Sequence, residues 1–89
     1  MPGNERLEKA LALTSLADGE SGRIVALSCG QPAIGKLEAM GILVGVEVEK
    51  RSSSLRRGPV VIVRGRVQVA LAHAIAKGIL VEPLGPRAR

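Results

Sequence analysis

The chain of 89 residues contains no Trp, Tyr or Phe. Its core must therefore be built from aliphatic side chains and Ala, which are plentiful, because hydrophobic residues make up 46% of the sequence. This composition predicts a folded chain rather than a disordered one, and the length allows one small domain. The missing aromatic rings also argue against a barrel that binds single-stranded nucleic acid, since such barrels stack bases on aromatic side chains.

Cysteine and histidine are almost as scarce, with Cys29 and His73 as single examples. One cysteine excludes an internal disulfide, and the pair cannot supply the four ligands of a structural zinc site. We interpret Cys29 as a small buried or half-buried apolar residue. A reactive thiol is the alternative, because a helix predicted to start at Pro32 lies close by. His73 is interpreted as a surface or partly packed side chain, with an exposed metal site as the alternative.

Long apolar runs are absent too, so no segment reaches the ~20 residues of a membrane helix. The N-terminal residues include acids and have no apolar stretch typical of a secretory signal. The sequence also has no phosphate-binding glycine loop, no nucleophile–histidine pattern and no paired-carboxylate signature. We therefore expect a cytoplasmic protein that is not an enzyme and needs no cofactor, with weak transition-metal binding left open.

Acidic residues are nearly missing from the second half of the chain. Residues 1–49 carry four Lys and Arg against seven acids, a net charge of −3, whereas residues 50–89 carry nine against one, a net charge of +8. Six of these basic residues fall in one acid-free span: Lys50, Arg51, Arg56, Arg57, Arg64 and Arg66. Such asymmetry favours an anionic partner, which includes nucleic acid, a membrane surface or an acidic protein face. A solvated loop is the alternative.

Apolar alternation predicts five short strands and little helix. The strands are expected at residues 23–28, 46–50, 60–63, 67–69 and 79–82, the third and fourth forming a hairpin. One short helix should follow the first strand, and a helical turn over residues 70–78 should precede the last. Five short strands with few helices favour a closed or nearly closed barrel. Residues 1–12 are an N-terminal extension that includes part of a possible short helix at 7–13.

The predicted helix begins at Pro32, which suits the first helical position. Ile34, Leu37 and Met40 are spaced to line one side of it. Glycines then mark the turns, because they reach positive φ at little cost. Gly41 is expected to end the helix, Gly45 to reverse the chain into the next strand, and Gly65 to form the hairpin turn. Gly58 and Pro59 close the polar loop before the third strand.

These elements together resemble the FeoA family of bacterial ferrous iron uptake. The resemblance runs from Leu13 to Glu82 and depends on an ordered set of residues. The set comprises Leu13, Leu16, Gly22, Lys36, Leu37, Gly41, Ile42, Gly45, Gly58, Pro59, Gly65, Leu71, Ala76, Ile79 and Val81. It implies an SH3-like barrel over residues 13–83, followed by a basic tail at 84–89.

The resemblance also implies a non-catalytic accessory role, in which the protein binds a FeoB-type membrane transporter from the cytoplasmic side and so lies at the inner membrane through its partner. We expect an apolar patch in the contact surface, formed by Leu43, Val44 and Leu55. Arginines would steer the approach to an acidic face: Arg51, Arg56, Arg57, Arg64 and Arg66. A metal-linked regulator or nucleic-acid-binding barrel that uses residues 50–66 is the alternative function. The sequence does not choose between a monomer and a weak homo-oligomer.

Overall fold

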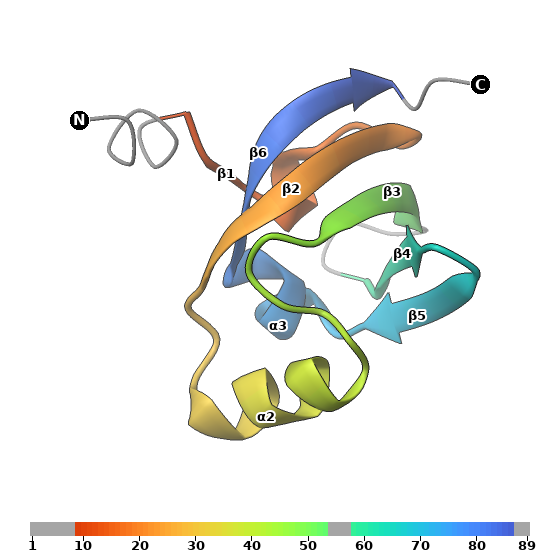
Figure 1. Ribbon diagram of the computed structural model, residues 1–89. Coiled ribbons are helices and arrows are strands. Elements are labelled where there is room, and N and C mark those ends of the chain that lie inside the picture. The colour runs from red at the N-terminus through yellow and green to blue at the C-terminus, as the bar shows by residue number, and fades with distance from the viewer. Residues whose placement is uncertain (1–8, 54–57, 87–89) are drawn as a thin grey trace.

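The computed structural model describes residues 9–53 and 58–86. It contains one curled antiparallel sheet, with a short helix below it and a helical turn inside the curl (Figure 1). In chain order the elements are β1 (Leu11–Ala12), η1 (Leu13–Ser15, a 3-10 turn), β2 (Glu20–Leu27), α2 (Gln31–Ala39), β3 (Glu47–Ser53), β4 (Val60–Arg64), β5 (Val67–Leu71), α3 (His73–Lys77) and β6 (Ile79–Pro86).

The strand order across the sheet is β1-β6-β2-β3-β4-β5, and every neighbouring pair is antiparallel. All five strands predicted from the sequence are present, as are the helix, the helical turn and the β4–β5 hairpin. The predicted SH3-like architecture is therefore confirmed. The sheet does not close completely, because β1 and β5 form its two ends and do not pair with each other over the residues described.

Two details of the prediction are wrong at the chain ends. Leu11 and Ala12 form a sixth strand, paired with Val81 and Leu80 of β6, where a helix over residues 7–13 was considered. The last strand also continues past Pro83 to Pro86 instead of ending near residue 82. Proline is tolerated there because β1 pairs only with Leu80 and Val81, so among the described residues no strand on that side of Pro83 needs its N–H.

The core consists of aliphatic side chains gathered from every strand except β1, together with η1, α2 and α3. Its fully or almost fully buried members are Leu13, Leu16, Ile24, Leu37, Ile42, Val48, Val60, Ile62, Leu71, Ala76, Ile79 and Val81. Leu13 and Leu16 belong to η1 and its C-cap, so this turn closes one end of the curled sheet. With no aromatic side chain to fill space, close backbone approach matters. A Cβ on Gly22 would lie 2.9 Å from Val81 Cβ.

Helix α2 ends in a Schellman motif, as the glycine in the sequence predicts. Gly41 has a φ of 79°. Its N–H donates to the carbonyl of Glu38 at 3.0 Å, and the N–H of Ile42 donates to the carbonyl of Leu37 at 2.8 Å. Leu37 and Ile42 are both buried, which supplies the apolar contact that usually accompanies this motif. The helix end is thus fixed by backbone hydrogen bonds and by the core.

Gly45 then turns the chain into β3. The N–H of Val46 donates to the carbonyl of Leu43 at 3.1 Å, and Gly45 has a φ of 95°, as the third residue of a type II turn requires. The N–H of Gly45 also donates to the carbonyl of Ile24 in β2 at 2.7 Å. Two glycines therefore hold the segment between α2 and β3 in one defined shape.

Candidate functional site

Three exposed apolar residues fall within five consecutive positions where α2 turns into β3. Met40 is 38% exposed, Leu43 is 40% exposed and Val44 is 60% exposed. We call these three residues the apolar corner. Leu43 and Val44 were predicted to be on the surface with core packing as the alternative, and their exposure excludes the core alternative. Met40 is a correction, since the helical spacing placed it on the buried side with Ile34 and Leu37.

The geometry of the helix end explains this exposure. The Schellman motif directs Leu37 and Ile42 inward, both at 1% exposure or less, so the residues between and after them face outward. Val44 occupies the second position of the tight turn, and its side chain is 60% exposed. The corner is apolar because of these side chains and rigid because of the backbone beneath them. The exposure of Met40 could have been predicted from Gly41, because the glycine ends the helix and the last helical residue then no longer faces the core.

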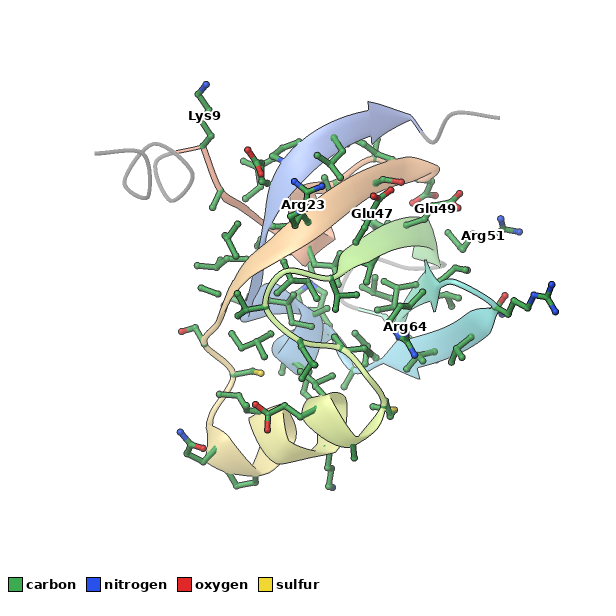
Figure 2. The ribbon with its side chains drawn as sticks, viewed as in Figure 1. Lys9, Arg23, Glu47, Glu49, Arg51 and Arg64 are labelled. Atoms are coloured by element: carbon green, nitrogen blue, oxygen red, sulfur yellow. The ribbon has the colours of Figure 1, made fainter. Side chains whose placement is uncertain are left out.

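Arg64 forms a cationic border to the apolar corner. It shares the inward face of β4 with the buried residues Val60 and Ile62, but lies at the end of the strand, against the segment that follows α2 (Figure 2). A Cβ on Gly41 would lie 2.7 Å from Arg64 Nη2 and 2.8 Å from Arg64 Cζ. The Nε atom is buried and has no hydrogen-bond partner among residues 9–53 and 58–86. The guanidinium therefore covers the glycine backbone and keeps an unused donor.

Lys50 does not belong to a basic surface, contrary to the expectation from the charge distribution. It is 4% exposed, and its Nζ donates to the carbonyl of Leu16 at 2.7 Å and to that of Thr14 at 3.1 Å. The side chain of Asp18 is 4.0 Å away. The alternation in β3 places Lys50 on the same inward face as Val48, so its side chain is buried beside the core. Its ammonium group binds backbone carbonyls of the η1 segment and is not available to a partner.

The other predicted basic residues are dispersed. Arg51 points outward from β3 and pairs with Glu49 at 3.8 Å (Figure 2). Arg66 is exposed in the β4–β5 turn, next to Gly65, whose φ is 60°. Gly58 and Pro59 lead into β4 as expected. The remaining predicted site residues, Leu55, Arg56 and Arg57, lie outside the described part of the chain.

The outer face of β2 and β3 carries charges of both signs. Arg23 is paired in register with Glu47 of β3 and with Glu82 of β6, and its guanidinium lies 3.8 Å from the Glu82 carboxylate. Figure 2 shows Arg23, Glu47 and Glu49 along this face. These side chains are partly or fully exposed, so they form a solvated surface rather than a field of one sign.

Cys29 and His73 are both half-buried. Cys29 is half-buried and packs against the core, which agrees with its interpretation as a small apolar residue. His73 is half-buried at the first position of α3. Within residues 9–53 and 58–86, no group of three or more His, Cys, Asp and Glu side chains is placed to hold a metal ion. In the same residues, no helix is long and apolar enough to cross a membrane.

Comparison with known proteins identifies the fold. The family model of the FeoA domain matches residues 11–83. An iron uptake regulatory protein (FeoA) of known crystal structure is 28% identical, with a TM-score of 0.74 over 84% of this chain and 97% of that chain. A FeoA-like protein from Clostridium acetobutylicum is 21% identical, with a TM-score of 0.76 over 91% and 94% of the two chains.

The same fold occurs inside larger proteins. A manganese-dependent transcriptional repressor is 21% identical, with a TM-score of 0.76 over 84% of this chain but only 42% of its own. None of the curated proteins with which the chain was compared matches its sequence. The family model covers most of the chain, and the solved FeoA structures share its fold. The chain therefore belongs to the FeoA domain family, whose role lies in ferrous iron transport.

Proposed function

We propose that this FeoA domain is a non-catalytic accessory module that binds a FeoB-type ferrous iron transporter from the cytoplasmic side. The family supports the link to ferrous iron transport. The observation that carries the proposal is the apolar corner, where three large apolar side chains are exposed within five consecutive residues. Such grouping on a small domain is typical of an interaction site, whereas single exposed apolar residues are ordinary.

The corner is well suited to bind another protein surface. Its backbone is held by the Schellman motif and by the turn at Gly45, so little conformational entropy is lost when it docks. Each Å² of apolar area removed from water contributes about 25 cal/mol, which makes Leu43 and Val44 the expected anchors. Arg64 would add specificity, because its buried Nε–H can donate a hydrogen bond to a carbonyl or carboxylate oxygen of the partner, the acceptor that it lacks among the described residues.

Nucleic acid is a weaker candidate partner for this chain. Three of its basic side chains already have contacts within the protein. Lys50 is buried and donates to the carbonyl of Leu16, Arg51 is paired with Glu49, and Arg64 lies against Gly41. Recognition of a phosphate backbone needs several free cations in a row, and it gives a steep dependence of affinity on salt. The similarity to a manganese-dependent transcriptional repressor, at 21% identity, extends to the fold alone. Duplex DNA therefore serves as a control ligand.

The proposal is tested by binding the N-terminally labelled full chain to a FeoB-type transporter in nanodiscs at physiological salt. We expect Leu43→Asp and Val44→Asp each to weaken binding about tenfold or more, because burying a carboxylate in an apolar contact is costly. Leu84→Asp is the matched control. Leu84 is 39% exposed, close to the value for Leu43, but belongs to the C-terminal part of β6, which Figure 1 shows at the opposite end from α2.

Empty anionic nanodiscs and duplex DNA complete the experiment. Binding that requires the transporter, and that Leu84→Asp leaves unchanged, supports the accessory role and locates it at the apolar corner. Equal binding to empty discs would show a general affinity for anions and overturn the proposal. Transporter binding that both corner variants retain would keep the accessory role but remove the corner as its surface.

A further inference from the structure

Strand β5 has an edge with which no other strand of the described residues pairs. It stands at one end of the strand order and pairs only with β4 over the residues that the structure describes. Natural edge strands usually carry a charge, a proline or a bulge that prevents pairing with another chain. The five residues of β5, Val67 to Leu71, have no charge and no proline, and their register with β4 runs without a break.

The register determines which backbone groups face outward. Arg64 and Val67 are paired across a two-residue turn, so this pair exchanges hydrogen bonds between the strands. Bonded and non-bonded pairs alternate along an antiparallel ladder, which makes Val69 bonded to β4 as well. Gln68 and Ala70 are the non-bonded positions, and their N–H and C=O groups point away from β4. Two donors and two acceptors thus lie along the free edge.

The side chains of β5 also divide by face. Val67, Val69 and Leu71 share the face of the sheet that covers the core, with Leu71 buried and Val69 half-buried. Val67 shares this face but is 44% exposed, because β5 is the last strand of the sheet over the described residues. Gln68 and Ala70 are on the opposite, exposed face. A further strand on this edge would cover Val67 and receive the outward backbone groups at the same time.

We propose that two copies of this chain associate through β5, antiparallel and centred on Val69. In this arrangement Gln68 of each copy lies opposite Ala70 of the other, and each such pair can exchange two backbone hydrogen bonds. Val67 of each copy lies opposite Leu71 of the other, so apolar side chains are paired on the core-facing side of the sheet. The edge is therefore complementary to itself in both hydrogen bonding and side-chain character.

Strand β5 lacks the charged side chains that would keep two copies apart at this edge. The chain carries a net charge of +5, so two copies repel each other over most approaches. Strand β5 is an uncharged segment through which they can meet without placing like charges opposite each other. The contact is small, with backbone bonds from only two residues of each copy. We therefore expect a weak dimer, with a dissociation constant between about 10 µM and 1 mM.

The first test is sedimentation velocity of the full chain from about 10 µM to 1 mM, over the expected range of affinity. Gln68→Lys with Ala70→Lys places two like-charged pairs across the contact and should weaken dimerisation about tenfold or more. Gln68→Glu with Ala70→Lys places opposite charges there and should retain it. Ser28→Lys with Ala39→Lys is the matched control, because it adds the same charge at exposed sites outside β5.

A second measurement uses the unaltered chain and so does not depend on whether the variants fold. Amide NMR spectra recorded over the same concentrations should show shifts and slower hydrogen exchange at Gln68 and Ala70, while the amide of Val69, already bonded to β4, changes little. A chain that stays monomeric at 1 mM would overturn the proposal, as would a dimer that all the variants form equally. A dimer lost with Leu43→Asp but not with the β5 lysines would assign association to the apolar corner instead.

Discussion

The guanidinium of Arg64 lies against the backbone of Gly41, so that a Cβ on the glycine would be only 2.7 Å from Arg64 Nη2. This contact joins the end of α2 to the β4–β5 hairpin, which are more than twenty residues apart in the sequence. It sets the border of the apolar corner and leaves the buried Nε without an acceptor in the described residues. Glycine is therefore required at position 41 for two reasons: the backbone has a positive φ, and the Arg64 guanidinium occupies the space where a Cβ would lie.

Replacing Gly41 with Ala should destabilise the protein by about 1–3 kcal/mol, because a side chain is strained at a φ of 79° and would displace Arg64. Gly35→Ala is the control. Gly35 lies within α2, its Cβ would meet nothing within 4 Å, and helix propensity predicts a gain of up to about 1 kcal/mol. Urea unfolding measures both. Equal effects at the two positions would contradict the role assigned to Gly41.

Replacing Lys50 with Met should lower the free energy of unfolding by about 1–3 kcal/mol, because the carbonyls of Leu16 and Thr14 would lose their donor. Lys36→Met, at an exposed position of α2, should change stability by less than about 0.5 kcal/mol. Asp18→Asn should also have a small effect, since this carboxylate is 59% exposed and 4.0 Å from Nζ. A large loss with Asp18→Asn would show that the ion pair, not the carbonyls, holds Lys50.

The apolar corner should contribute little to folding. Leu43→Asp and Val44→Asp are expected to change the free energy of unfolding by less than about 0.5 kcal/mol, because both side chains are exposed. Ile42→Ala, directly beside them but fully buried, should cost about 2–5 kcal/mol. Guanidinium unfolding checks this before any binding experiment. If Leu43→Asp destabilised the protein as much as Ile42→Ala, its effect on transporter binding would no longer locate a contact surface.

Gly22→Ala should destabilise the core by about 1–3 kcal/mol, because the added Cβ would lie 2.9 Å from both Cβ and Cγ2 of Val81. Val81→Ala removes one of these atoms, although it opens a cavity of its own. The two changes together should therefore cost less than their sum. Thermal or urea unfolding of the four proteins of this double-mutant cycle measures the coupling, and strict additivity would show that the two residues do not meet.

Local sequence patterns predicted most of the elements because the relevant interactions are local. The β-branched run at Val60 and the glycine turn at Gly65 specify the hairpin, while Pro32 and Gly41 mark the start and end of α2. The exposure of Leu43 and Val44 was also predictable, since both lie in a tight turn. Met40 was misplaced because helical spacing was extended to a residue at the helix end, where the chain already turns away.

Two other errors have non-local causes. Alternation places Lys50 on the inward face with Val48, but its carbonyl acceptors belong to residues 34 and 36 positions earlier in the chain. Charge counting cannot show that such acceptors exist, and it assigned this lysine to a surface. Pro83 was taken as a strand end, although it is tolerated because β1 does not reach that part of β6.

The sequence by itself determined an aliphatic domain with a short helix, a hairpin and the ordered glycines of the FeoA family, because propensity, alternation and turn chemistry act over a few residues. Only the tertiary structure decided where the cations lie and which edges remain open. Lys50 is buried, Arg64 borders the apolar corner, and β5 keeps its outward backbone groups unpaired in the described fold. The physical reason is that burial and strand pairing depend on contacts between distant segments, which no local pattern specifies.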